Sequence, residues 1–182
     1  MTDRRAGVAV TLDALLAARD LRVARREQVF AARPGPVVSV SVVMPGPVKD
    51  CELSRHAQSA ALASLDRLFA DNGWPAETLW AETPGTGPEA LVIVGADAEA
   101  LKRATIVLED SHPLGRLWDL DVVTPDGAVS RRDLNFVPRR CFVCDRPAHE
   151  CARSRAHSLE ALLAVMEEKI DASLDGTRAP GG

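Results

Sequence analysis

The 182-residue sequence predicts an α+β fold in which a mixed sheet is flanked by helices. Apolar residues recur at helical spacing in four segments, and short β-branched runs lie between them. These helices and strands interleave irregularly, unlike the regular alternation of a parallel α/β fold. With 46% hydrophobic and 26% charged residues, the chain can form one domain with its own core.

Local signals place the elements in order. Thr11 is a suitable N-cap for a helix that ends near residues 33–36, where prolines and a glycine follow. The β-branched run 37–44 predicts a strand that ends at a Pro-Gly-Pro turn, and a second helix is expected over 52–72. The second half of the chain predicts strands at 77–82 and 90–94, a helix over 97–108, a strand at 117–123, a strand starting near 128 after a hairpin turn, and a helix over 158–172.

We expect a single domain over residues 10–173, a flexible N-terminus at 1–9 and a disordered tail at 174–182. The N-terminus lacks an apolar stretch of signal-peptide length, and no apolar run approaches the roughly 20 residues that span a bilayer. The sequence therefore favours a cytoplasmic protein without a membrane partner. Its four cysteines are expected to be reduced thiols or metal ligands.

Charge is distributed unevenly along the chain. The net charge is −4, but residues 131–155 hold seven arginines and three acidic residues. This arginine-rich segment predicts a binding site for anions or a dock for an acidic partner. Aromatic residues make up 4% of the chain and tyrosine is absent, so we expect no nucleic-acid partner.

Asp119 and Asp121 stand two apart on a predicted strand, which puts both carboxylates on one face, where they can share a divalent cation. The preceding loop from His112 to Arg116 offers Gly115 for a close backbone approach to an anion and a guanidinium for phosphate. The alternative interpretation of such a pair is the solvent face of a strand.

A second group of candidate ligands lies within residues 139–157. Its members are the ligand types of a tetrahedral zinc (Zn²⁺) site, namely Cys141, Cys144, Cys151 and His157. Incidental reduced thiols, or one nucleophilic cysteine with His157 as its base, are the alternatives. Cys51 has no evident partner in the sequence.

Several motifs resemble those of one family. They are Pro45-Gly-Pro-Val-Lys-Asp50, Ala104-Thr-Ile-Val-Leu-Glu109, the block Ser111-His-Pro-Leu-Gly-Arg-Leu-Trp-Asp-Leu-Asp-Val122, and Arg139-Arg-Cys-Phe-Val-Cys144 with Cys151, Arg153 and His157. On these residues, the chain is similar over about 10–172 to the apo-citrate lyase phosphoribosyl-dephospho-CoA transferases, also called holo-acyl-carrier-protein synthases of citrate lyase.

The resemblance implies a transferase of prosthetic group biosynthesis. Such an enzyme moves the phosphoribosyl-dephospho-CoA group from 2′-(5″-triphosphoribosyl)-3′-dephospho-CoA to a serine of the citrate lyase acyl carrier protein, the gamma subunit, and releases pyrophosphate. This is nucleotidyltransferase-type chemistry, which needs cations such as magnesium (Mg²⁺). It assigns Asp119 and Asp121 as catalytic Mg²⁺ ligands, and as substrate-binding residues Lys49, His112, Gly115, Arg116, Arg131 and Arg132.

The wider nucleotidyltransferase fold usually has a Gly-Ser pair well before its D-x-D and a third carboxylate on a later strand. This chain has Gly115-Arg116 instead, and Asp133 and then Glu109 are the candidates for the third carboxylate. Because acyl carrier proteins are typically acidic, the arginine-rich segment is expected to dock the carrier. Two other functions stay open: a non-catalytic, zinc-stabilised adaptor for an acidic partner, and a general nucleotidyltransferase that uses nucleoside triphosphates.

Overall fold

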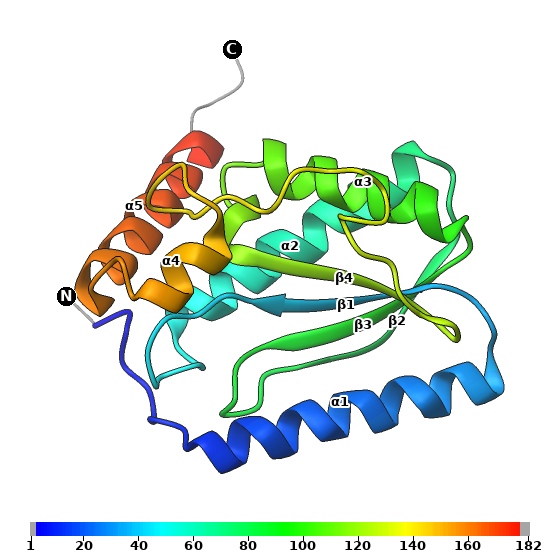
Figure 1. Ribbon diagram of the computed structural model, residues 1–182, viewed down its shortest axis with the longest axis horizontal. Coiled ribbons are helices and arrows are strands. Elements are labelled where there is room, and N and C mark those ends of the chain that lie inside the picture. Colours follow the sequence, from blue (N-terminus) through cyan, green and yellow to red (C-terminus); the bar gives the residue numbers. More distant parts are fainter. Residues whose placement is uncertain (1–2, 179–182) are drawn as a thin grey trace.

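The computed structural model describes residues 3–178 and contains a five-stranded sheet with helices on both faces (Figure 1). The strands are β1 (Val37–Val42), β2 (Ala76–Glu82), β3 (Glu89–Val94), β4 (Trp118–Thr124) and β5 (Gly127–Ala128). The helices are α1 (Leu12–Ala32), α2 (Glu52–Asp71), α3 (Ala98–Ser111), the 3-10 turn η1 (Gly115–Leu117), α4 (Ala148–Ser154) and α5 (Leu159–Arg178). All the predicted helices and strands are present, and the α+β class is confirmed.

Polar side chains start three of the long helices. Thr11 accepts a hydrogen bond from the amide of Ala14 at 3.2 Å, and Asp97 accepts one from Ala100 at 2.9 Å. Ser158 accepts a similar bond at the start of α5, at 3.1 Å. These bonds satisfy amides that have no partner within the helix, which is why the sequence signals for these helix starts were reliable.

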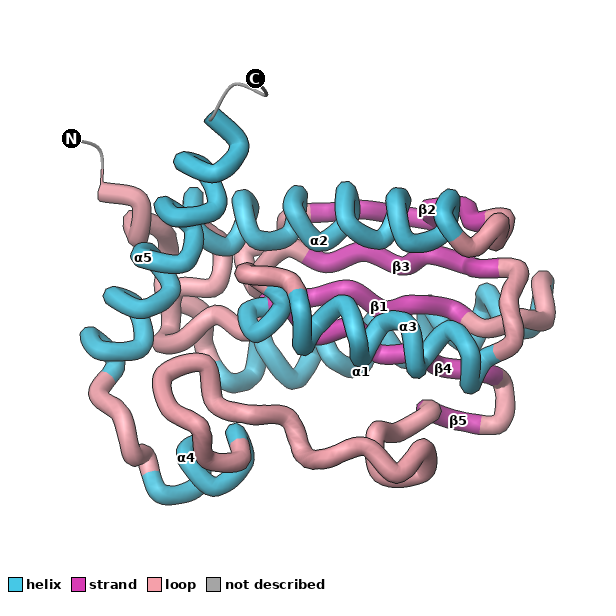
Figure 2. The backbone as a smooth tube through the Cα atoms, turned by 90° about the horizontal axis from the view of Figure 1, so that it is seen from above, coloured by secondary structure: helices cyan, strands magenta, loops and turns pink. Residues whose placement is uncertain are grey.

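The strand order is β2-β3-β1-β4-β5, and all neighbouring pairs are antiparallel (Figure 2). The expectation of a mixed sheet is therefore wrong. The strands that α2 joins, β1 and β2, run parallel to each other, but β3 lies between them. In the same way, β1 lies between β3 and β4, which α3 joins. This interleaving of two β-α-β units is the ferredoxin-like arrangement, here with β5 added at one edge.

The two faces of the sheet differ in character. The face under α2 and α3 forms the core, where Trp118, Leu120 and Val122 of β4 are completely buried. The opposite face is crossed by α1 (Figure 1), which has no buried residue and is tied to the sheet by ion pairs. Buried Glu89 of β3 forms ion pairs with Arg22 at 2.9 Å and with Arg25 at 3.4 Å. Because side chains alternate along a strand, Asp119 and Asp121 lie on this second, polar face.

Along its outer edge, β4 pairs with β5 only at its last two residues. Side chains bind the backbone groups of the rest of this edge. Buried Lys102 donates to the carbonyl of Leu120 at 2.9 Å, and buried Glu109 accepts from the amide of the same residue at 3.0 Å. The guanidinium of Arg139 donates to the carbonyl of Trp118 at the start of the strand. The backbone groups that face outward are thus bound by charged side chains rather than by another strand.

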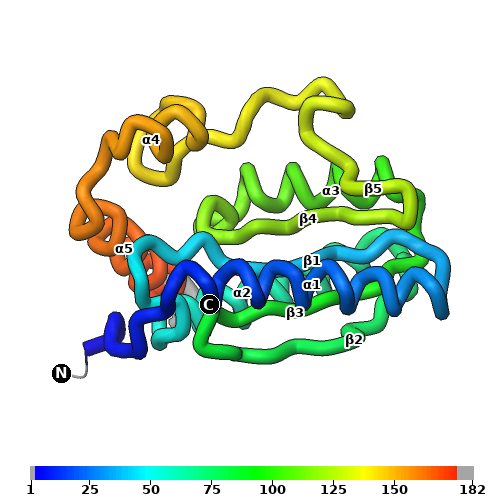
Figure 3. The backbone as a smooth tube through the Cα atoms, turned by 60° about the horizontal axis from the view of Figure 1, so that its bottom comes forward, coloured from blue at the N-terminus to red at the C-terminus, as the bar shows by residue number. Residues whose placement is uncertain are grey.

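A long loop runs from β5 back along the β4 edge to α4, as Figure 3 shows in yellow. Helix α4 was not predicted, because it is seven residues long and too short to show apolar periodicity. At the N-terminus, expected to be flexible, Arg4 pairs with Glu52 of α2 at 2.8 Å and Arg5 pairs with Glu167 of α5 at 2.5 Å.

In the region of the expected tail, α5 continues to Arg178, and residues 179–182 lie outside the described part of the chain. Among residues 3–178, none of the helices is both long enough and apolar enough to cross a bilayer.

Candidate functional site

The two predicted aspartates lie near the beginning of β4, on the face that α1 crosses. Asp119 is paired in register with Ser41, and Asp121 with Ser39. The pKa of Asp121 is raised above its ordinary value, first by partial desolvation and then by the negative charge of Asp119. Repulsion between two neighbouring carboxylates is relieved when a cation lies between them. The structure thus places both carboxylates on one face of β4, as the D-x-D spacing predicted, and a cation between them stays a prediction.

Arg139 connects this carboxylate pair to the arginine-rich segment. Its Nη1 donates to Oδ1 of Asp119 at 3.3 Å. Its Nη2 donates to the carbonyl of Arg116 at 3.0 Å as well as to that of Trp118. The guanidinium thus holds the start of β4 and one of the two candidate metal ligands together. The resemblance instead implied Arg116, Arg131 and Arg132 as the phosphate-binding arginines, so the contact of Arg139 with Asp119 was not predicted.

Beside Asp119, four arginines line a cavity of about 760 Å³, namely Arg116, Arg139, Arg140 and Arg155. The Nη1 atom of Arg116 is buried and has no hydrogen-bond partner, although it lies 3.3 Å from a carboxylate oxygen of Asp110. Burial lowers the pKa of Arg116, and the positive charges of Arg131, Arg139 and Arg140 lower it further. Like charges gathered around a buried donor favour the binding of an anion.

The other walls of this cavity come from distant parts of the chain. They include the Pro-Gly-Pro turn after β1, the Cys/His segment and the first turn of α5. Gly46 in that turn has a φ of +79°, and a Cβ there would lie 3.0 Å from Leu159. Only glycine suits both the backbone conformation and the close contact. The turn therefore has a specific role in shaping the cavity.

Two other predicted substrate-binding residues have partners of their own. Lys49 is half-buried, its Nζ donates to the carbonyl of Met44 at 2.5 Å, and burial lowers its pKa. His112 ends α3 and stacks on Trp118 with ring centroids 4.4 Å apart. Its pKa is lowered, mainly by burial, and its Nδ1 accepts from the amide of Leu114 at 3.0 Å. Because the side chain of Trp118 belongs to the core face, the structure does not bring His112 to the aspartates.

Gly115 and Arg131 also make internal contacts. The amide of Gly115 donates to the carbonyl of His112 at 2.9 Å, and a Cβ at this position would lie 2.4 Å from the carbonyl oxygen of Glu109. This glycine is therefore needed where η1 packs on the end of α3. Arg131 pairs with Glu109 at 2.7 Å and with Asp110 at 3.1 Å, whereas Arg132 is exposed.

The two candidates for a third carboxylate are engaged elsewhere. Glu109 binds the β4 edge and Arg131, and Asp133 accepts from the amide of Ser130 at 3.4 Å. Within residues 3–178, neither joins Asp119 and Asp121 in a group close enough to share an ion. A cation at the aspartate pair would need further oxygen ligands from water or substrate, which is the usual way in which Mg²⁺ binds at phosphate-transfer sites.

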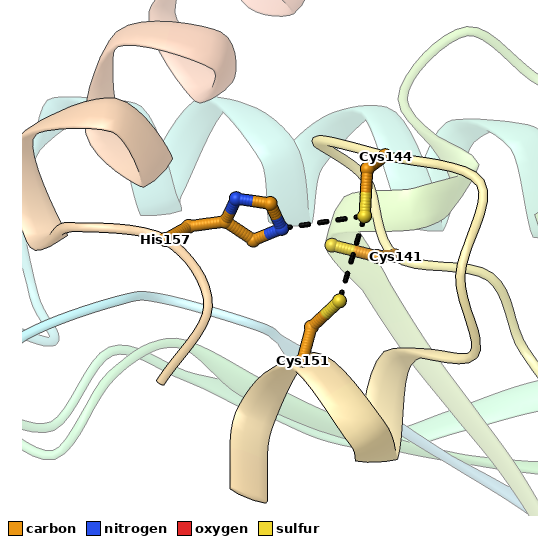
Figure 4. A group of neighbouring side chains, drawn as sticks. All are labelled: Cys141, Cys144, Cys151 and His157. Atoms are coloured by element: carbon orange, nitrogen blue, oxygen red, sulfur yellow. Dashed lines mark hydrogen bonds between the residues drawn. The ribbon is translucent and has the colours of Figure 1, made fainter. Parts of the chain in front are cut away.

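The cysteines and the histidine come together as the spacing predicted (Figure 4). The Sγ of Cys144 lies 3.5 Å from the Sγ of Cys151 and 3.4 Å from Nε2 of His157. All four ligand atoms, with the Sγ of Cys141 included, lie within 4.8 Å of one another. Tetrahedral zinc with sulfur and nitrogen ligands places them about 3.5–3.8 Å apart. The group can therefore hold a metal ion such as zinc.

Local structure presents these ligands to one another. The amide of Cys141 donates to the carbonyl of Arg146 at 2.8 Å, which closes the loop that carries the first two cysteines. Hydrogen bonds lower the pKa of Cys144 to about 6, and the largest contribution comes from the backbone of Arg146. The pKa of Cys151 is raised to about 11, mainly by burial. Cys51 lies apart, buried at the start of α2.

Comparisons with known proteins identify the family of the chain. A family model described as apo-citrate lyase phosphoribosyl-dephospho-CoA transferase matches residues 10–173. The curated protein of that name from Escherichia coli O9:H4 (strain HS) is 46% identical over 164 residues, which are 90% of each chain. The protein of the same name from Shigella boydii serotype 18 shows the same identity and coverage.

Proposed function

Because the chain belongs to the family of apo-citrate lyase phosphoribosyl-dephospho-CoA transferases, we propose that it attaches this prosthetic group to a serine of the citrate lyase acyl carrier protein. The protein is an enzyme of the transferase class. The donor is 2′-(5″-triphosphoribosyl)-3′-dephospho-CoA. The observation that best supports this reaction is the pair of Asp119 and Asp121 beside a guanidinium-lined cavity.

The reaction is a displacement at the phosphorus next to the ribose. The serine oxygen forms a bond to this phosphorus, the bond to the bridging oxygen breaks, and pyrophosphate leaves with the electron pair. Asp121 is the candidate to accept the serine proton, because it is exposed and, unlike Asp119, is not ion-paired with Arg139. Arg116 and Arg139 line the adjoining cavity and would neutralise charge on the triphosphate.

Magnesium at Asp119 and Asp121 would supply further charge neutralisation on the leaving group. Two carboxylates with phosphate oxygens and water form a suitable donor set for this ion. In the structure, Asp119 is paired with Arg139. We infer that this guanidinium keeps the carboxylate in place and turns toward phosphate when the donor binds.

The reaction is tested by incubating the protein with apo carrier, donor and Mg²⁺ and measuring the mass of the carrier. We expect an increase by one phosphoribosyl-dephospho-CoA unit. An adaptor that only binds the carrier gives no increase. A general nucleotidyltransferase would instead modify the carrier when ATP replaces the donor, and that result would contradict the proposal.

Exposed arginines of the segment 131–155 are the proposed dock for the carrier. Arg131 and Arg139 are engaged internally, and Arg140 and Arg155 line the cavity, so the dock would use Arg132, Arg146 and Arg153. Because attraction between exposed charges is screened by salt, raising ionic strength should raise the KM for the carrier several-fold with little change in kcat. An unchanged KM would contradict this dock and leave the transfer reaction in place.

A further inference from the structure

We propose that the cavity beside Asp119 binds the dephospho-CoA part of the donor, with the diphosphate at Arg140 and Arg155 and the pantetheine arm along the apolar walls. This inference rests on the proposed function, because the family supplies the chemical group that is transferred. It adds a location for the part of the donor that does not react.

The cavity has the size and setting of a small-molecule site. Its volume of about 760 Å³ lies within the range of roughly 300–1,000 Å³ that is typical of ligand pockets. Segments that are distant in the sequence meet there: the turn after β1, the turn η1, and the stretch from the Cys/His segment to the start of α5. It also adjoins the proposed reaction centre, because Arg139 both lines it and contacts Asp119.

The guanidinium groups give the cavity a place for anionic oxygens. Arg140 and Arg155 both line the cavity and are exposed, so their donors can reach a ligand there. The Nη1 of Arg140 lies 3.7 Å from a carboxylate oxygen of Asp145, which is too far for a hydrogen bond. A diphosphate would give these two guanidinium groups acceptors of matching geometry and charge.

The remaining lining argues against a ligand that consists of phosphates alone. Most of it is apolar and includes Met44, Phe142, Leu159 and Leu162. A triphosphate offers nothing that such walls could bury. Dephospho-CoA, in contrast, joins an adenosine diphosphate to a long pantetheine arm that carries no charge, so one molecule matches both the charged and the apolar lining.

The experiment measures binding to the full chain by calorimetry without the carrier. The probes are S-methylated dephospho-CoA, whose blocked thiol does not bind a metal, and ADP, which has the same adenosine diphosphate but no pantetheine. We expect the first probe to bind at least about tenfold more tightly than ADP, because it also fills the apolar part of the cavity. Equal affinity for the two probes would overturn the proposal.

A change in the apolar wall locates the arm. Leu162→Ser should remove most of the affinity difference between the two probes and leave ADP binding unchanged. The matched control is Leu21→Ser on α1, where the leucine is 51% exposed and lies outside the cavity; this variant should keep the full difference. If Leu162→Ser fails to fold, Leu159→Ser at a 44% exposed wall position makes the same test. A folded wall variant that keeps the full difference would overturn the proposal.

The charged lining is tested by Arg140→Ala, which should weaken both probes by similar factors, about tenfold. The matched control is Arg19→Ala, an exposed arginine of α1 that does not line the cavity. Equal behaviour of these two arginine variants would overturn the placement of the diphosphate. These measurements do not depend on transfer: tight binding of dephospho-CoA with no modification of the carrier would contradict the proposed function and retain the cavity site.

Discussion

Asp119→Asn and Asp121→Asn are each expected to reduce transfer to the carrier by at least about 10³-fold. Asparagine has nearly the same shape as aspartate, so β4 and its pairing with β1 should be retained. The substitution removes the negative charge that holds a cation on the triphosphate, and at Asp121 it also removes the proposed base. Initial rates of carrier mass increase measure the loss.

Asp126→Asn is the matched control for these two variants. Asp126 is an exposed aspartate in the turn between β4 and β5, only a few residues beyond the pair. We expect its rate to equal that of the unchanged protein, with all three variants showing the same far-UV circular dichroism. If either Asp119→Asn or Asp121→Asn kept more than about a tenth of the rate, the proposed metal-carboxylate mechanism would be wrong.

Cys144→Ser and Cys151→Ser should abolish metal binding and destabilise the protein. Few side chains of residues 139–157 are buried, so the four ligands are the main connection available between the Cys141 loop, α4 and the start of α5. Structural zinc sites contribute directly to folding free energy. We expect one zinc per chain in the unchanged protein, none in the variants, and a fall in Tm of at least about 5 °C.

Metal analysis and thermal unfolding measure this effect, and Cys51→Ala is the control. Cys51 is buried at the start of α2, away from the cluster, so its replacement should leave the metal content unchanged whatever it does to Tm. Because Arg139 directly precedes the cluster and contacts Asp119, loss of the metal should also slow transfer. Protein that is fully active and equally stable without metal would contradict a structural role for the ion.

The sequence was most informative where a signal is local. The alternation of apolar and acidic residues in β4 was enough to place Asp119 and Asp121 on one face, because a strand has a period of two. The C-x2-C spacing and the downstream cysteine and histidine likewise predicted the cluster. The strand order could not be predicted from local signals. It depends on contacts between distant segments, which place β3 between β1 and β2, and β1 between β3 and β4.

The arginines and His112 show where sequence proximity misleads. Arg131 and Arg139 both follow the D-x-D strand in the sequence. The path of the loop along β4 brings Arg139 to Asp119 and Arg131 to Glu109. His112 is close in sequence to the aspartates, but the turn η1 leaves its ring against Trp118 on the core side. These contacts depend on how distant segments pack together, which residue spacing does not predict.

The completed edge of β4 also bears on how the protein behaves at high concentration. A strand with free amides and carbonyls along one side is a template on which another chain can extend the sheet. Here Lys102, Glu109 and Arg139 already occupy those groups around Trp118 and Leu120. A second molecule would have to displace buried charges before it could add a strand at this position, which protects the enzyme against edge-to-edge aggregation.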